Sequence, residues 1–287
     1  MDNRQSIKLI ECPRDAMQGW KHPIATDVKI NYIKSLLEAG FDTIDFGSFV
    51  SPKAIPQMAD TPEVYEAIKD NLGNNQLLAI IANERGAQQA ASLQHISYLG
   101  FPFSISPTFQ MRNTNATIQE AFERVKNIQA ICLQHQKTLV VYLSMGFGNP
   151  YGDPYSELIV MEWAKKLTEA GIKILSLADT VGIATAEQVY TTTHRLISEF
   201  PAIEIGVHLH ASAETRIEKL QAAFEAGCIR YDGALKGFGG CPMAKDDLVG
   251  NMDTEWMIDF FEKKSIDTGI NKTALHKATA LALQVFQ

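Results

Sequence analysis

Two histidines separated by a single residue give the clearest sign of chemistry in this sequence. His208 and His210 end the stretch IEIGVHLHA, whose apolar residues predict a buried β-strand over 203–211. Side chains at positions i and i+2 of a strand share a face, roughly 6–7 Å apart along the chain. Imidazole and carboxylate ligands suit Mg²⁺, Mn²⁺ or Zn²⁺. The pair therefore predicts a divalent-metal site, with a hydrogen-bonded structural pair as the alternative.

Charged residues near two earlier apolar runs complement the histidines. Arg14 and Asp15 stand where the run SIKLIEC ends, and Asp45 lies inside the next run, FDTIDFGSF. A buried carboxylate needs a partner, and Arg14 is the natural partner of Asp45. We expect Asp15 to be a metal ligand and Arg14 to be a fixed cation. Ion pairs without chemistry explain the same residues and remain the alternative.

A glycine-rich segment, KGFGGCPMAKDDLVGN, places a cysteine at the tip of a loop. Gly239 and Gly240 let the backbone fold sharply before Cys241. A thiol held over a metal site is a candidate proton donor, whereas a buried small hydrophobe is the alternative. Phosphate binding is a rival, but no GK[ST] follows the glycines. Asn251 could return an amide oxygen to the metal.

Apolar runs alternate with amphipathic helical segments, which predicts the elements that position these residues. Eight such runs occur, namely SIKLIEC, FDTIDFGSF, QLLAIIAN, HISYLGFPFSI, TLVVYLSMGF, IKILSLAD, IEIGVHLH and RYDGALKGF. Three of the intervening helices end in EAG, and a glycine there is the usual left-handed stop. This alternation predicts an α/β fold, a parallel (β/α)8 TIM barrel, with a doubly wound open sheet as the alternative.

The length of the chain, 287 residues, is normal for one such barrel. We expect a single catalytic domain over 1–287 with an additional C-terminal helix in the tail, 265–287. The segment NKTALHKATALALQVFQ in that tail is apolar enough to pack on the barrel or on a partner subunit. A homodimer is therefore expected.

Composition excludes several classes of function. The net charge is −7 without a basic block, so we expect no nucleic-acid partner. No apolar run reaches about 18 residues, so we expect no membrane span. The four cysteines are scattered without a pairing pattern, and the first residues lack a signal-peptide pattern. These features predict a cytoplasmic protein.

Polar residues at the carboxyl ends of barrel strands face the catalytic mouth. The further residues that meet this condition are Ser48, Lys53, Ser144, Ser176 and Asp179. We expect them to contact the substrate, with Lys53 as a cation for an anionic end of it. Capping of the following helix is the alternative for Asp179.

Five segments of the chain form a recognisable set, namely PRDAMQ, SFVSPKAIPQMAD, LADTVG, VHLH and GFGGCPMA…GN. Together they resemble the 3-hydroxy-3-methylglutaryl-CoA (HMG-CoA) lyase family, among the metal-dependent TIM-barrel lyases and condensing enzymes. The resemblance covers about Ile7 to Glu255. The metal ligands that it implies are Asp15, His208, His210 and Asn251. The catalytic residues that it implies are Arg14, Asp45, His208 and Cys241.

The resemblance implies cleavage of HMG-CoA, an acyl-CoA, to acetyl-CoA and acetoacetate, as in leucine degradation. His208 would carry a proton, Arg14 would stabilise the thioester oxygen, and Cys241 would deliver the final proton. The implied cofactor is a divalent cation, Mg²⁺ or Mn²⁺ before Zn²⁺.

Departures from the family pattern lie beside the expected ligands. Asp45 stands where the family usually has Glu. The residues after His210 are Ala-Ser-Ala-Glu, where the family usually has Asp-Thr and then Gly two residues on. This removes a carboxylate next to the site. The cysteine loop carries AKDDLV where small residues are usual.

Three other functions remain open. A condensing enzyme that adds acetyl-CoA to a 2-oxo acid would usually have Glu-Arg where Cys241 and Pro242 stand. An aldolase acting on 4-hydroxy-2-oxo acids would not need the GGCP loop. A catalytically weak barrel that binds a metal and an acyl-CoA is suggested by the altered segment HLHASAE.

Overall fold

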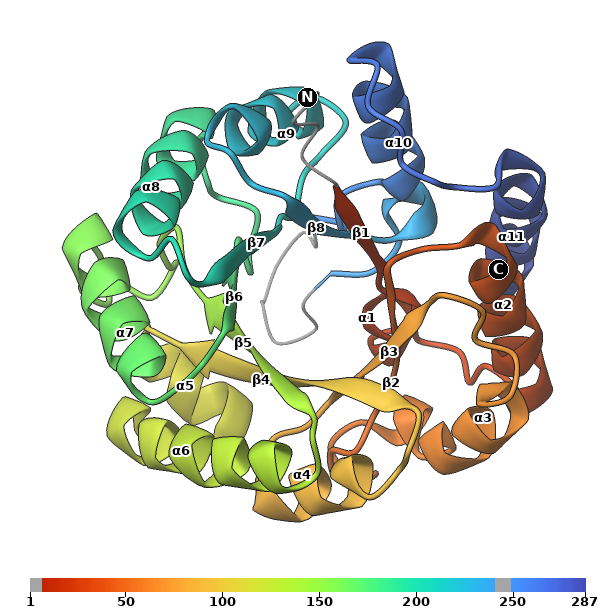
Figure 1. The fold of residues 1–287 in the computed structure, drawn as a ribbon, viewed down its shortest axis with the longest axis horizontal. Coiled ribbons are helices and arrows are strands. Elements are labelled where there is room, and N and C mark those ends of the chain that lie inside the picture. The colour runs from red at the N-terminus through yellow and green to blue at the C-terminus, as the bar shows by residue number, and fades with distance from the viewer. Residues whose placement is uncertain (1–6, 241–248) are drawn as a thin grey trace.

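Each apolar run of the sequence forms one strand of a closed parallel barrel (Figure 1). The computed structural model describes residues 7–240 and 249–287. The strands are β1 (Lys8–Glu11), β2 (Thr43–Ser48), β3 (Gln76–Ile80), β4 (Ile96–Ser104), β5 (Thr138–Ser144), β6 (Ile174–Ala178), β7 (Glu204–His208) and β8 (Arg230–Gly233). They follow one another around the barrel, and β8 closes it against β1. The predicted TIM barrel is confirmed.

Helices form a ring outside the strands (Figure 1). The α-helices are α1 (Pro13–Gln18), α2 (Thr26–Ala39), α3 (Thr61–Ile68), α4 (Glu84–Ala91), α5 (Pro107–Thr114), α6 (Ile118–Gln134), α7 (Glu157–Glu169), α8 (Ala186–Glu199), α9 (Arg216–Glu225), α10 (Thr254–Lys263) and α11 (Lys272–Val285). Two short 3₁₀ helices are η1 (Pro56–Met58) and η2 (Leu235–Gly237).

The three EAG segments end helices as predicted. Gly40, Gly171 and Gly227 have φ values of 84°, 91° and 91°. A side chain is strained in this left-handed region, and glycine is not. Each glycine therefore turns the chain back toward the next strand.

Three helices were not expected from the sequence, namely α1, α5 and α10. Both α1 and α5 have proline within their first two residues, which is compatible with a helix start. The Asp253 side chain caps α10 by accepting from two backbone N–H groups. Because α1 begins at Pro13, Arg14 and Asp15 lie on a short helix just past the end of β1, where the sequence predicts them.

The C-terminal helix packs on its own barrel, beside α2 (Figure 1). The Asn271 backbone N–H donates to the Ala39 carbonyl at 2.9 Å, and Lys277 pairs with Glu38 at 2.9 Å. The Phe286 ring lies 5.2 Å from that of Trp20, measured between centroids. The tail thus covers a face of the barrel beside the first β/α unit.

None of the helices formed by residues 7–240 and 249–287 combines the length and the apolar character needed to cross a bilayer.

Candidate active site

His208 ends β7 and is held by a carboxylate on the neighbouring strand. Its Nδ1 atom lies 3.2 Å from Oδ2 of Asp232, a buried residue of β8. An Nδ1–H that donates to a carboxylate leaves the Nε2 lone pair free for another ligand. Burial opposes the charge of His208, but Asp232 raises its pKa above 6.5. The sequence analysis missed Asp232, although an acid inside the run RYDGALKGF was the available signal.

His210 lies just beyond β7, in an isolated antiparallel bridge with Asn251. The two histidines still face each other, with 3.3 Å between their Nε2 atoms. Burial and the neighbouring His208 lower the pKa of His210 to about 3. The His210 imidazole is therefore neutral at physiological pH and can offer a lone pair.

Asp15 approaches the histidines from α1. Its Oδ1 accepts from Arg14 Nη1 at 2.9 Å and from Gln18 Nε2 at 2.8 Å, and its Oδ2 accepts from Asn251 Nδ2 at 2.9 Å. Burial opposes ionisation, but Arg14 and the histidines lower the pKa of Asp15 to about 2. Asp15 is therefore an oriented carboxylate anion.

These side chains fit a divalent cation. One ligand atom each from Asp15, His208 and His210 lies within 4.8 Å of the other two. The Asn251 amide donates its N–H groups to Asp15 and to the Phe238 carbonyl, while its buried Oδ1 finds no hydrogen-bond partner among the described residues. A carbonyl oxygen left free beside two imidazoles and a carboxylate is the donor that a cation would satisfy. This free oxygen favours a metal site over a merely hydrogen-bonded histidine pair.

A second group, Cys12, His208 and Asp232, also brings three ligand atoms within 4.8 Å of one another. Burial raises the pKa of Cys12 well above its ordinary value, so the thiol is protonated at neutral pH. Asp232 is already engaged with Nδ1 of His208. The first group is therefore the better metal site.

Arg14 pairs with Asp45, as the sequence predicts. Its Nε lies 3.2 Å from Asp45 Oδ1, and its Nη2 contacts Oδ2. Burial opposes the charge, but Asp45 and Asp15 raise the pKa of Arg14 above its ordinary value. Arg14 is thus a permanent cation in a fixed position beside the candidate metal ligands.

The segments on either side of the cysteine loop, residues 235–240 (the first stem) and 249–254 (the second stem), are hydrogen-bonded to the end of β1. Glu11, at the end of β1, accepts from the Leu235 backbone N–H at 2.9 Å and from Thr254 Oγ1 at 2.6 Å. Gly239 has φ +99°, and a Cβ there would lie 2.7 Å from Asn251 Nδ2. Glycine is therefore required where the first stem passes Asn251. Cys241 itself lies outside the described residues.

The chain resembles a known protein family over most of its length. The HMGL-like family matches residues 7–282. The chain belongs to the HMGL-like family. Mouse mitochondrial hydroxymethylglutaryl-CoA lyase is 32% identical over 277 residues, covering 96% of this chain and 84% of that protein.

Two further relatives of this HMGL-like chain bear on its substrate. The 3-hydroxy-3-isohexenylglutaryl-CoA/hydroxymethylglutaryl-CoA lyase of Pseudomonas aeruginosa is 32% identical, covering 96% of this chain and 91% of that protein. The structure of an HMG-CoA lyase from Acinetobacter baumannii in complex with coenzyme A and 3-methylmalate superimposes with a TM-score of 0.91 at 30% identity. That match covers 100% of this chain and 93% of the other.

Two of the serines expected to contact substrate, Ser48 and Ser144, end strands of the HMGL-like barrel, whereas Ser176 lies in the middle of its strand. Ser48 Oγ accepts from the Val50 backbone N–H at 3.2 Å, so it also holds the turn after β2. Ser144 ends β5 and is buried. Ser176 lies within β6, and its buried Oγ has no partner in the part of the chain that the structure describes. Lys53 is exposed in the segment after β2.

Asp179 is engaged within the protein. Its Oδ2 accepts from Lys219 Nζ at 2.7 Å and its Oδ1 from the Ala184 backbone N–H at 3.1 Å. Both carboxyl oxygens therefore already have donors. Asp179 does not cap α8, because Thr185 does so through a capping box with Gln188.

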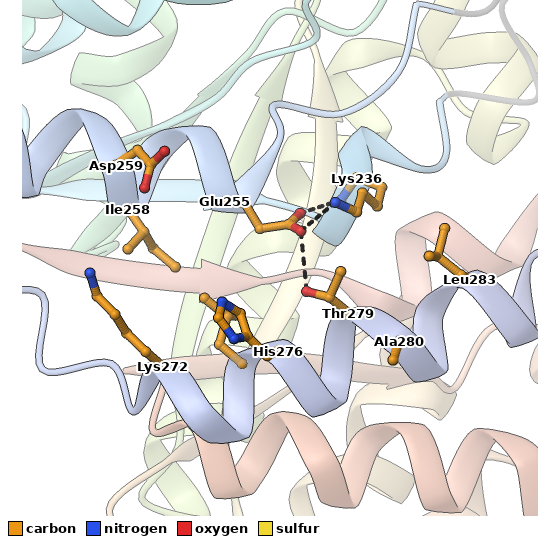
Figure 2. Close-up of a pocket in the computed structure, with 10 residues that line it drawn as sticks. Lys236, Glu255, Ile258, Asp259, Lys272, His276, Thr279, Ala280 and Leu283 are labelled. Carbon is orange, nitrogen blue, oxygen red and sulfur yellow. Dashed lines mark hydrogen bonds and ion pairs between the residues drawn. The ribbon is translucent and has the colours of Figure 1, made fainter.

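A separate cleft of about 480 Å³ lies on the outside of the barrel, between α10, α11 and η2 (Figure 2). Figure 2 shows Glu255 between Lys236 and Thr279, at 2.8 Å from Lys236 Nζ and 3.1 Å from Thr279 Oγ1. None of the predicted site residues lines this cleft. It is distinct from the candidate active site.

Proposed function

We propose that this chain is a divalent-metal-dependent lyase that cleaves HMG-CoA to acetyl-CoA and acetoacetate. The observation that carries the proposal is the convergence of Asp15, His208 and His210 with Asn251 Oδ1, which has no hydrogen-bond partner among residues 7–240 and 249–287. The relatives named above, HMG-CoA lyases at 30–32% identity over nearly the whole chain, support the reaction.

Asp15, His208, His210 and Asn251 would hold the cation. A divalent cation held there, Mg²⁺ or Mn²⁺ before Zn²⁺, would lower the pKa of a substrate hydroxyl and orient the substrate. The harder oxygen donors of Asp15 and Asn251 favour the first two ions.

His208 is the proposed proton carrier for the C3 hydroxyl. Asp232 at Nδ1 would stabilise the imidazolium that forms when Nε2 accepts that proton. Nε2 cannot hold a metal ion and a proton together. The proposed ligand and base roles of His208 therefore exclude each other at any one moment.

Arg14 supplies positive charge where the reaction develops negative charge. Its pKa is too high for a base. When the C2–C3 bond breaks, its electron pair moves into the enolate of the acetyl-CoA thioester, and C3 becomes the ketone of acetoacetate. A guanidinium fixed by Asp45 and Asp15 can stabilise that enolate oxygen without reorganising.

Cys241, or a water that it positions, is proposed to protonate the enolate carbon. The hydroxyl proton leaves to the base and one proton returns to carbon, so the reaction needs no further reactant. Ser48, Ser144 and Ser176 are proposed substrate contacts, together with Asp179. Lys53 is proposed to meet an anionic end of the coenzyme A.

We also propose that the enzyme is a cytoplasmic homodimer. The described cysteines Cys12, Cys132 and Cys228 are free and buried, which suits a reducing compartment. Leu283 of α11 is half exposed and offers apolar surface to a second copy.

The test is a coupled assay with HMG-CoA on metal-stripped protein, with and without Mg²⁺ or Mn²⁺. We expect release of acetyl-CoA and acetoacetate only when a cation is added. Binding of metal without any cleavage would contradict the proposed substrate. A parallel assay with 3-hydroxy-3-isohexenylglutaryl-CoA tests the acyl group, because one relative is named for that longer substrate.

A further inference from the structure

Lys219 of α9 is a buried lysine whose ammonium group makes three hydrogen bonds. Its side chain is 1% exposed. Nζ donates to Asp179 Oδ2 at 2.7 Å, to the Gly182 carbonyl at 2.9 Å and to the His210 carbonyl at 2.9 Å. An ammonium has three N–H donors, so every one of them has an acceptor.

These three bonds add to the backbone hydrogen bond from Asp179 N–H to the His208 carbonyl, which joins the same two segments at 2.9 Å. His210 lies beyond the end of β7, outside the parallel strand pairing. Asp179 and Gly182 belong to the loop between β6 and α8. Lys219 therefore fixes the backbone of a candidate metal ligand to the adjacent loop.

The same loop meets the second stem of the cysteine loop. Gly182 has φ +73°, and a Cβ built there would lie 2.8 Å from Cβ of Val249. The Gly182 carbonyl held by Lys219 is thus part of a surface that Val249 contacts closely. The lysine supports His210 and this contact together.

The sequence directly after His210 leaves a role for such support. Ala211 stands directly after the second histidine and offers no carboxylate that could orient the site. Groups that orient metal ligands usually change metal affinity when they are removed. The Lys219–Asp179 pair supplies buried polar contacts at this position instead.

We propose that Lys219 is a positioning residue that holds His210 for metal binding, with Asp179 as its charge partner. The inference rests on the metal site of the proposed function. It assigns a role to a lysine that touches neither substrate nor metal.

A single substitution would mix two effects. Lys219→Met removes the bond to the His210 carbonyl but also leaves Asp179 as an uncompensated buried charge, which destabilises a fold strongly. The double variant Lys219→Met/Asp179→Asn removes both charges, so its Mn²⁺ affinity reports the lost hydrogen bonds to the His210 and Gly182 carbonyls without a buried unpaired charge. Lys137→Met is a matched control, because Lys137 Nζ also donates to two carbonyls, those of Leu93 and Gln94, outside the site.

The experiment measures Mn²⁺ affinity of the metal-stripped variants by calorimetry and their metal-free stability by urea unfolding. We expect both Lys219 variants to bind Mn²⁺ about 10- to 100-fold more weakly than the wild type. The double variant should regain part of the stability that the single variant loses. Lys137→Met should keep wild-type affinity.

Wild-type Mn²⁺ affinity in the double variant would overturn the inference and leave Lys219 a purely structural ion pair. A wild-type protein that binds no Mn²⁺ would overturn the metal site of the proposed function, and this inference with it. The wild-type measurement therefore separates the two failures.

Discussion

The interior of the barrel has two unlike sides. The apolar side is formed by Leu78, Ile80, Val140, Tyr142 and Ile174, on β3, β5 and β6. The charged side is formed by Arg14, Asp45, His208, Arg230 and Asp232, from α1, β2, β7 and β8. The other candidate metal ligands, Asp15, His210 and Asn251, lie next to the charged side. Residues of one barrel interior thus divide between packing and chemistry.

This division shows how a charged site is kept inside a core. The apolar side excludes water and lowers the local dielectric, which strengthens each interaction on the charged side. The same low dielectric makes every unpaired charge costly, so Arg14 is flanked by two carboxylates. Arg230 is paired less completely than Arg14. Its Nη1 lies 3.2 Å from Glu204 Oε1, but its Nε and Nη2 have no partner among residues 7–240 and 249–287.

The largest effect on activity is expected when the proposed proton donor of the reaction, Cys241, is removed. Cys241→Ala should lower kcat about 10²- to 10⁴-fold, the usual contribution of a general acid, and leave the metal content unchanged. Steady-state kinetics with metal analysis checks this. Cys132→Ala is the control, since Cys132 is buried in α6 and burial raises its pKa to about 12. Equal kcat values for Cys241→Ala and wild type would remove the cysteine from the mechanism.

On the apolar side, a truncation should affect stability and spare metal binding. Leu78→Ala leaves a cavity in a fully buried layer and should cost about 2–5 kcal/mol of unfolding free energy. Urea unfolding measures the loss, and calorimetry with Mn²⁺ at low temperature should give wild-type affinity for the folded protein. A large fall in affinity would show that the two sides are not separable.

On the charged side, a substitution that keeps the shape of the side chain should weaken metal binding more than it lowers stability. Asp232→Asn preserves the size of the side chain but removes the charge that holds Nδ1 of His208. Mn²⁺ affinity should fall about 10- to 100-fold. Glu204→Gln removes a carboxylate from the amino end of β7 and should leave that affinity unchanged. If both variants bind Mn²⁺ equally well, the Asp232–His208 contact has no special role.

The sequence predicted the fold well because the barrel follows from local pattern. Alternation of apolar runs with amphipathic segments needs no knowledge of distant contacts. The Arg14–Asp45 pair was also predictable, since a buried acid requires a cation on a neighbouring element. The same argument applied to RYDGALKGF would have found Asp232.

The buried contacts of Lys219 and Glu11 could not be predicted from local sequence patterns. Lys219 lies in a helix at a spacing that also fits a solvated face, and only the packed structure shows it turned inward. Glu11 ends β1, and its acceptor role depends on Leu235 and Thr254, more than 220 residues away. Contacts between such distant parts of the chain leave no periodic trace in the sequence.

Glu11 gives the smallest expected effect, a change in how stability depends on pH. Burial raises the pKa of Glu11 from 4.5 to about 8, although Thr254 and Leu235 donate to the carboxyl. A group with a raised pKa in the folded state binds its proton more tightly there than in the unfolded chain. Its contribution to stability is therefore complete below about pH 4.5 and is lost as the pH rises through about 8.

Glu11→Gln cannot ionise and should remove this dependence. Between about pH 4.5 and 8, the wild-type unfolding free energy should fall relative to that of the variant. Urea unfolding at several pH values within this window measures the difference, and the other titrating groups cancel because both proteins carry them. Parallel curves for the two proteins would mean that Glu11 is ionised in the fold, stabilised by its two donors, Leu235 and Thr254.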